Sequence, residues 1–431
     1  MTAKPTLTPH RPPARTVVLA MTGVACLLAA CYLLYQRALI TFPSDLSAIY
    51  MAARFYDLGQ FALIYSAPEG FFGTSPPLWQ PAIDELGMTG EFVTPFVYPP
   101  LWAAIFSPVA AHLGPRAFFD LAAVVQIPLL AATPFLAWRI ATPRAPELGV
   151  WLTISGALLF TSQVAAFAVD LLQPQILVTF VSLLAFERYR HGRSVTAGAL
   201  LGLATVFKLA PAALALIFLL DRDWRSLGSF TATCAVFCIA SLLTVGIDLH
   251  LAFLASVREV GEIAFLSASN FSVEPLLSAF SVMSGVTPPV DLAARNISFT
   301  GAHVALSGAV AKGLFLLLLV WCIWRSGKCA PESRLTLRLL SFALLANLFG
   351  PLGWIHYYLL PLFLLPALPS LLRQPWGSLL LVFVALATSH WVFWALYWSR
   401  PGDLPVVIVQ TGTWLLLLIS ANALARNGPA E

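Results

Sequence analysis

The chain has 431 residues, of which 59% are hydrophobic and 10% are charged, and its formal net charge is +4. Soluble domains carry about 25% charged residues, so 24 basic and 20 acidic side chains are too few to solvate a water-soluble protein of this length. The composition excludes a soluble multidomain enzyme and a disordered chain. It predicts an all-α polytopic membrane protein that forms one domain over residues 1–431.

Apolar segments that are long enough to cross the lipid bilayer, or nearly so, predict about 12 transmembrane helices. They lie at residues 17–35, 96–113, 117–138, 149–169, 174–187, 197–220, 226–246, 301–324, 335–352, 357–372, 377–397 and 405–424. Arg11 and Arg15 precede the first segment as in a signal peptide, but its length of about 20 residues favours a retained helix. The six cysteines show no metal-ligand spacing and predict neither a disulfide framework nor a metal site.

Two long polar stretches, residues 36–95 and 247–300, interrupt the apolar segments, and each holds more acidic than basic residues. The chain before the first apolar segment and the loop at 325–338 are basic instead. Because cytoplasmic loops are enriched in Lys and Arg, we expect both long stretches outside the cell membrane. The N- and C-termini of this multi-pass protein are then both expected in the cytoplasm.

Arginines that follow the third and fifth apolar segments do not fit strict alternation of 12 crossings. Either these two loops are exceptions to the charge rule, or the segments at 96–113 and 197–220 both fail to cross. The second of these contains Lys208 and Pro211 near its middle, which is typical of a broken or short helix. Removing both segments leaves the two long stretches on one face.

Both long stretches also contain helical periodicity. The first has apolar residues at helical spacing from Ala48 to Tyr56, and the second has them from Phe253 to Ala264. We therefore expect amphipathic helices in both outer loops, lying along the membrane surface.

Ser44-Asp45 opens the first of these amphipathic segments. A carboxylate just outside the bilayer is suited to deprotonating a hydroxyl, because partial burial raises its pKa toward neutrality. The alternative is a helix N-cap, a position that Ser and Asp both favour. Taken alone, the residue favours the cap, since caps far outnumber catalytic bases.

Polar side chains inside or at the edge of apolar segments are costly and therefore functional candidates. They are Asp170, Gln173, Gln175, Lys208, Asn347 and His356. Lys208 is a lone cation that either binds a phosphate or extends to the lipid headgroups. His356 follows a Gly/Pro break, and its ring nitrogens either bind a phosphate leaving group or are satisfied locally at the interface.

The order of these features resembles glycosyltransferase family 87 of the GT-C superfamily. The matching segments are Ser44-Asp45 with Tyr50-Met51-Ala52-Ala53, Phe96-Val97-Tyr98-Pro99-Pro100 leading to Ser107-Pro108, Gln173-Pro174-Gln175, Ala197-Gly198 through Lys208 to Pro211, Arg222-Asp223-Trp224-Arg225, Asn270-Phe271-Ser272 and Pro351-Leu352-Gly353-Trp354-Ile355-His356-Tyr357-Tyr358. Two positions depart from the family pattern. The family usually has Gly-Gln-x-Asn where this chain has Leu172-Gln173-Pro174-Gln175, and Gln where it has Phe271.

The resemblance implies a GT-C-type helical bundle that transfers a hexose, by default mannose, from a polyprenyl-phosphate donor. The acceptor would be a glycolipid or glycan hydroxyl on the extracytoplasmic face, and the reaction an inverting single displacement. The resemblance implies Asp45 as the catalytic base, with Lys208 and His356 near the donor phosphate. The further candidates for substrate binding are Arg54, Tyr98, Gln173, Gln175, Asn270 and Tyr357. No cofactor or metal is expected, because a lipid phosphate is already a good leaving group.

Two other functions compete with this interpretation. A transporter or flippase of lipid-linked sugars would use the same membrane core and the same intramembrane polar groups. The chain shows no repeated halves, however, and its polar residues are concentrated in the two long stretches rather than at mid-membrane. A catalytically silent membrane scaffold is the third possibility. A nucleic-acid partner is not expected, because no basic run is interleaved with aromatic residues.

Overall fold

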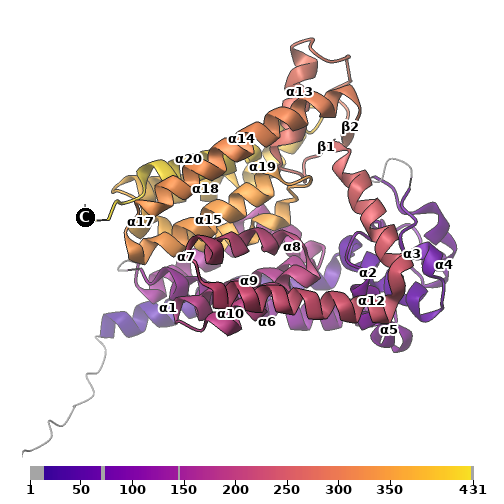
Figure 1. Ribbon diagram of the computed structural model, residues 1–431, viewed down its shortest axis with the longest axis horizontal. Coiled ribbons are helices and arrows are strands. Elements are labelled where there is room, and N and C mark those ends of the chain that lie inside the picture. The colour runs from indigo at the N-terminus through magenta and orange to yellow at the C-terminus, as the bar shows by residue number, and fades with distance from the viewer. Residues whose placement is uncertain (1–13, 69–72, 144–145, 429–431) are drawn as a thin grey trace, which may run out of the picture.

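Five helices are long and apolar enough to cross a membrane in the computed structural model, which describes residues 14–68, 73–143 and 146–428 (Figure 1). They are α1 (Ala14–Ile40), α6 (Pro115–Ala141), α12 (Trp224–Gly261), α14 (Ala302–Gly327) and α20 (Leu404–Leu424). A sixth candidate is the pair α8 (Gln163–Asp170) and α9 (Gln175–Arg190), which is bent by 119° between the two helices. The all-helical membrane class is confirmed, but the 12 transmembrane helices predicted from the sequence are not.

The other predicted apolar segments form shorter helices, often joined in series. They are α5 (Leu101–His112), α7 (Leu148–Thr161), α10 (Ser194–Phe207), η2 (Ala210–Ala215), α11 (Leu216–Leu220), α15 (Pro331–Phe349), η3 (Ile355–Tyr358), α16 (Leu359–Leu364), η4 (Leu365–Ala367), α17 (Leu368–Leu371), α18 (Trp376–Ala387) and α19 (His390–Ser399). A 12-residue helix such as α5 is only about 18 Å long, which is shorter than the roughly 30 Å hydrocarbon core.

Of the two alternatives for segment 197–220, the structure shows the broken helix, and the segment folds back as a helical hairpin. Its helix α10 ends at Phe207, and Lys208 then adopts an extended conformation with φ −155° and ψ 128°. Pro211 accounts for this break, because its ring would clash with the Phe207 carbonyl four residues earlier in a continuous helix. The two ends of the hairpin meet again, since the Ser194 hydroxyl donates a 2.7 Å hydrogen bond to Asp223. Lys208 therefore lies at the tip of a hairpin that enters and leaves the bundle at the same end.

Helix α12 extends well beyond the boundary at residue 246 that the apolar pattern predicts. Gly246 lies at φ 80° and ψ 168° and kinks the helix, which then continues to Gly261. The second half buries Phe253 and Val260 and leads to a short antiparallel sheet, β1 (Ala264–Leu266) with β2 (Ile297–Phe299), in which Phe265 pairs with Ser298. Helix α13 (Val273–Met283) lies between the two strands in the chain.

The first long polar stretch folds as α2 (Ser44–Asp57), α3 (Phe61–Ile64), η1 (Pro77–Trp79) and α4 (Gln80–Glu85). The predicted helix is present, but the protein encloses it on most faces instead of leaving one polar face exposed. Ten of the 14 residues of α2 are buried, including Ala48, Ile49, Ala52 and Phe55, and α2 packs against α5 and α6. Small side chains on several faces allow this helix to be enclosed rather than half-exposed.

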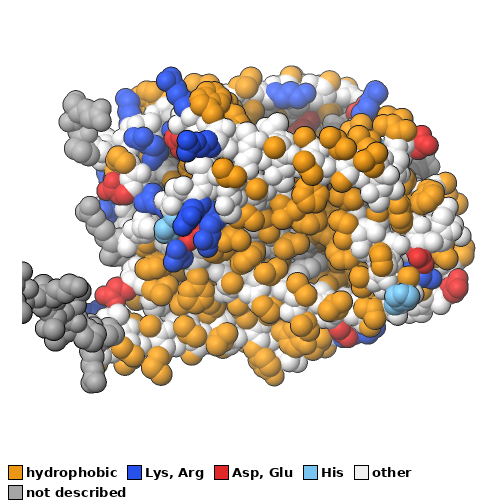
Figure 2. Space-filling view, turned by 60° about the horizontal axis from the view of Figure 1, so that its bottom comes forward, with side chains coloured by type: hydrophobic (Ala, Val, Ile, Leu, Met, Phe, Trp, Pro, Cys, Tyr) orange, Lys and Arg blue, Asp and Glu red, His pale blue; other side chains and the backbone are white. Residues whose placement is uncertain are grey.

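Charged side chains gather at the ends of the bundle, and a broad hydrophobic band lies between them (Figure 2). At one end, which we call the basic end, the buried Glu187 accepts a 2.6 Å hydrogen bond from Arg139. The buried Arg338 pairs there with Asp221 at 2.5 Å. Helices α9, α10 and α11 all reach this end, and the hairpin tip with Lys208 lies away from it.

Candidate active site

Asp45 lies in the first turn of α2, directly after the first membrane-spanning helix. No side chain caps this helix, because Pro43 occupies the N-cap position. The Asp45 carboxylate instead accepts a short hydrogen bond from the amide of Gln173, which is 128 residues away in the chain. The capping alternative is therefore wrong for Asp45, and its carboxylate faces a polar cluster made by other segments.

Gln173 occupies the sharp turn between α8 and α9. The residue before it, Leu172, has a positive φ of 42°, and its carbonyl accepts a 3.0 Å hydrogen bond from the buried Gln126. This contact holds the Gln173 side chain, which is 2% exposed, against both Asp45 and the hydroxyl of Tyr98, 3.1 Å away. The turn therefore joins the first long polar stretch to the bundle core.

Lys208 projects from the hairpin tip into the same cluster. Its Nζ atom lies 4.0 Å from the ring centroid of Tyr357 and 5.9 Å from that of Tyr98, which is cation–π geometry. The tip is held from the side by Trp102, whose indole donates a 2.8 Å hydrogen bond to the Phe207 carbonyl. This is the carbonyl that the helix break leaves without an intrahelical partner. Trp102 therefore satisfies the backbone that Pro211 disrupts.

His356 and Tyr357 reach the cluster from η3, which follows the Gly/Pro break after α15. The two rings pack edge to face with centroids 4.8 Å apart. His356 is 1% exposed, and neither of its ring nitrogens hydrogen bonds to any residue that the structure describes. No protein group that the structure describes satisfies this histidine locally. A buried imidazole without a protein partner is typical of a group reserved for a ligand.

The surroundings of Asp45 raise the pKa of its carboxyl above the ordinary range. The main cause is burial, which disfavours the charged form. Hydrogen bonds from Gln173 and Thr94 and the positive charge of Lys208 act in the opposite direction and lower the pKa. The carboxyl therefore has a higher proton affinity than a solvent-exposed aspartate, as a general base requires.

Three predicted site residues make their side-chain contacts outside this cluster. Arg54 lies near the C-terminal end of α2 and pairs with Asp57 at 3.2 Å. Gln175 donates a 3.3 Å hydrogen bond to Thr179, within its own helix. Asn270 is fully buried, and its side chain bonds to the surrounding loop. Asp170, an intramembrane candidate, pairs with Arg37 at the end of α1.

Several residues that build the site carried no clear signal in the sequence. Trp102, Thr94 and Gln126 act on backbone atoms or on Asp45 from other segments. The contacts of Trp102 and Gln126 span from 46 to 105 residues of sequence, which local patterns do not reveal. No group of three or more His, Cys, Asp or Glu side chains placed to hold a metal occurs in the described ranges.

An apolar cavity of about 400 Å³ lies beside the hairpin, between η2, α11, α12, α14 and α15. Ala212 and Ala213 in its lining follow Lys208 by about one helical turn. Ala346 in its lining precedes Asn347, whose amide donates a 2.9 Å hydrogen bond to the Tyr357 carbonyl. One end of the cavity therefore approaches the polar cluster that contains Lys208.

Together these side chains provide a carboxylate of raised pKa, a cation and a buried, unpartnered imidazole, beside an apolar cavity in a membrane bundle. A carboxylate can accept a proton from a hydroxyl, and a cation and an imidazole can stabilise an anionic leaving group. The fold and the side chains of this cluster thus fit the class of membrane-embedded group-transfer proteins.

The sequence comparison agrees with this class and makes it specific. Residues 96–352, more than half of the chain, match glycosyltransferase family 87, and the protein belongs to this family. The chain is 24% identical over 311 residues to the polyprenol-phosphate-mannose-dependent alpha-(1-2)-phosphatidylinositol mannoside mannosyltransferase of Mycobacterium tuberculosis, covering 69% of this chain and 67% of that protein. It is 27% identical over 318 residues to the protein of the same name from Mycolicibacterium smegmatis, covering 70% and 68%. The resemblance seen in the sequence is confirmed.

Proposed function

We propose that this protein transfers a mannosyl group from a polyprenyl-phosphate donor to a hydroxyl of a glycolipid or glycan. The single observation that carries the proposal is the convergence of Asp45 with Lys208 and Tyr357, from three distant segments, next to the unpartnered His356. Membership of a glycosyltransferase family supports the reaction class. The donor is supported by the names of the two mycobacterial relatives.

The proposed step is a single displacement with inversion at the sugar. The acceptor hydroxyl oxygen attacks the anomeric carbon, and its proton passes to the carboxylate of Asp45. The bond from the anomeric carbon to the phosphate oxygen breaks, and the lipid phosphate leaves with that electron pair. Lys208 and His356 stabilise the departing phosphate by charge and hydrogen bonding.

We place the polyprenyl tail of the donor in the apolar cavity beside the hairpin. The cavity is lined by Ala, Leu and Phe side chains, and burying each CH₂ group of a lipid contributes about 0.8 kcal/mol. Because one end of this cavity approaches Lys208, a tail that lies there brings its phosphate toward the cation. The same arrangement keeps water away from the leaving group.

The reaction is proposed for the extracytoplasmic face. In support, Asp45 and Lys208 lie away from the basic end of the bundle, where Arg139, Arg338 and their partners gather. Basic loops mark the cytoplasmic side of membrane proteins. A cysteine placed at Glu85, an exposed residue of α4 in the same polar stretch as Asp45, is expected to react with an impermeant thiol reagent from outside intact cells.

Asp45→Asn tests the assignment of the base. The change keeps the size of the side chain and one acceptor oxygen but removes its ability to take a proton. Positioned bases contribute about 10²- to 10⁴-fold to rate, so we expect kcat to fall by about 1,000-fold in an assay that measures release of lipid phosphate from polyprenyl-phosphate mannose.

Asp84→Asn is the matched control, because Asp84 is an exposed acid in the same outer loop. It is expected to leave kcat unchanged. Near-normal turnover of Asp45→Asn would refute Asp45 as the base. If the unaltered protein moves lipid-linked sugar across a bilayer without releasing lipid phosphate, the flippase alternative replaces the transferase.

Ala213→Phe tests the placement of the donor tail. Ala213 lines the cavity, and a phenyl ring there would occupy volume that the tail needs. We expect the KM for long-chain donors to rise about tenfold, while a donor with a short prenyl chain is less affected. Ala232→Phe, on the exposed surface of α12, is the control. Equal KM values for both variants would refute the placement of the donor tail in this cavity.

A further inference from the structure

Asn270, predicted to contact substrate, is enclosed instead by its own loop. It is fully buried, and its Nδ2 donates a 2.7 Å hydrogen bond to the Phe265 carbonyl. Its Oδ1 accepts from the Gly353 N–H at 2.7 Å and from the backbone and hydroxyl of Ser272 at 3.3 and 3.1 Å. These contacts occupy the amide oxygen and one of the two amide N–H donors, and the side chain is 0% exposed, so it offers no surface to a sugar.

The bond to Gly353 joins the Asn270 loop to the segment that carries His356. Phe271 N–H donates to the Gly353 carbonyl at 2.8 Å, and Ile355 N–H donates to the Ser269 carbonyl at 2.8 Å. Gly353 itself fits only without a side chain, since a Cβ there would lie 2.5 Å from the Asn347 carbonyl and 2.7 Å from the Ser272 nitrogen. The backbone just before His356 is thus paired on both sides.

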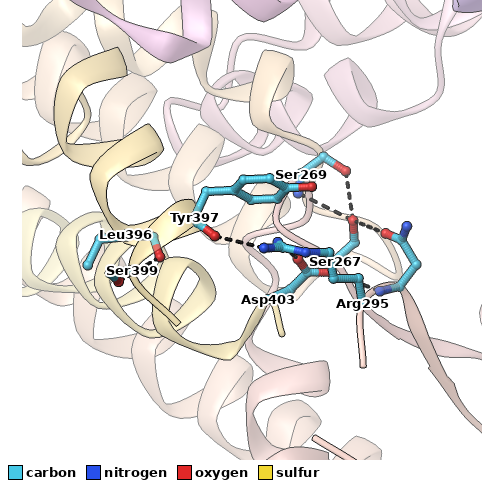
Figure 3. A network of polar contacts seen from close by, with 8 residues as sticks. Ser267, Ser269, Arg295, Leu396, Tyr397, Ser399 and Asp403 are labelled. Atoms are coloured by element: carbon cyan, nitrogen blue, oxygen red, sulfur yellow. Dashed lines mark hydrogen bonds and ion pairs between the residues drawn. The ribbon is translucent and has the colours of Figure 1, made fainter. Parts of the chain in front are cut away.

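The Asn270 loop is in turn fixed to the far end of the chain (Figure 3). The Ser267 hydroxyl donates a 2.9 Å hydrogen bond to the Asn296 side chain, and the Asn296 N–H donates to Asp403 at 2.8 Å. Arg295 pairs with the same carboxylate at 2.9 Å and stacks over Tyr397 with its guanidinium carbon 3.6 Å from the ring centroid. Asp403 is 2% exposed, so this anchor is well shielded from water.

We propose that Asn270 is a positioning residue for His356. By holding the Gly353 N–H, its amide fixes where the unpartnered imidazole stands relative to Lys208, and it touches neither donor nor acceptor. The expected effects on kcat rest on the proposed function, whereas the hydrogen bonds by which Asn270 fixes the backbone before His356 do not. A displacement of about 1 Å at a reacting group can cost about 100-fold in rate.

A double-mutant cycle tests the proposal. Asn270→Ala alone is expected to lower kcat by about 100-fold with little change in the acceptor KM. In a His356→Ala background the same change is expected to cost less than about threefold, because groups that act through one another are not additive. An equal loss in both backgrounds, or a raised acceptor KM at normal kcat, would overturn the positioning role.

Asn422→Ala is the matched control, because Asn422 is also a fully buried asparagine with bonds to Ser341 and Leu418. Asn422→Ala is expected to lower kcat by the same factor in the original protein and in the His356→Ala background. Asn270→Asp keeps the acceptor for Gly353 and is expected to recover most of the kcat that the alanine loses. Failure of this conservative variant to exceed the alanine variant would also contradict the proposal.

Amide hydrogen exchange separates this proposal from the proposed function. In the purified protein, Asn270→Ala is expected to speed exchange across residues 353–356 relative to Asn422→Ala, whether or not the assay detects sugar transfer. Unchanged exchange there would overturn the positioning role. An inactive unaltered protein with the expected exchange would refute only the transferase.

Discussion

The two ends of the helical bundle use their charges in opposite ways. At the basic end, Arg139 and Glu187 pair, as do Arg338 and Asp221, so buried charge is neutralised by protein partners. At the site, Lys208 forms no direct ion pair with a described carboxylate but lies over the Tyr357 ring and interacts with Asp45 at longer range, and the ring nitrogens of His356 have no described partner. Paired groups hold a structure together, whereas unpartnered groups retain a costly capacity to bind. The difference separates what folds this protein from what we propose acts on substrate.

Among the changes that test this comparison, removing the charge of Lys208 has the largest expected effect on activity. Lys208→Met keeps the length and apolar stem of the side chain but removes its charge. We expect kcat/KM for the donor to fall by at least about 100-fold, the scale of one electrostatic contact to a leaving group, with no loss of thermal stability. Lys312→Met, at an exposed lysine of α14, is the control. A Lys208 variant with normal turnover but lower thermal stability would show that Lys208 stabilises the fold and does not act on substrate.

Breaking a pair at the basic end is expected to do the opposite. Arg338→Ala leaves Asp221 without its partner and should lower the free energy of unfolding by about 2 kcal/mol, reduced from the value for a fully buried pair because Asp221 is partly exposed. Thermal unfolding in detergent measures this loss. The kcat of the folded fraction should stay within about twofold of the original; a large loss of turnover would mean that this end contributes to the reaction.

The pH dependence of activity gives the smallest and most specific effect. Because burial raises the pKa of Asp45, kcat/KM should fall on acidification at a pH above the ordinary aspartate value of about 3.9. Gln173→Met removes a hydrogen bond that lowers this pKa, so the acidic limb should move to still higher pH. Gln175→Met serves as the control. If the acidic limb of the pH profile does not move in Gln173→Met, Gln173 does not influence the pKa of the catalytic base.

The helical class and the approximate position of most helices followed from the sequence, because apolar segments of this length have no other stable arrangement in lipid. The number of crossings did not. Segment 197–220 has the composition of a span, yet Pro211 breaks it and Ser194 meets Asp223 at its base. The composition of a segment indicates that it favours a lipid environment. Whether the segment crosses the membrane or folds back depends here on a single break in the helix.

The site residues, too, followed in part from the sequence and in part only from the tertiary structure. Asp45, Lys208 and His356 stood out because charged and polar groups are rare in this chain, and that rarity is a local property. Their assembly depends on contacts over long separations, such as Asp45 with Gln173 and Trp102 with Phe207. Asn270 shows the limit of the local signal, since its place in the sequence pattern indicated substrate contact while its hydrogen bonds go to Phe265 in its own loop and to Gly353 in the distant segment that carries His356. The sequence alone determined which residues are costly in a membrane, and the tertiary structure decided which of those costs are offset by protein partners.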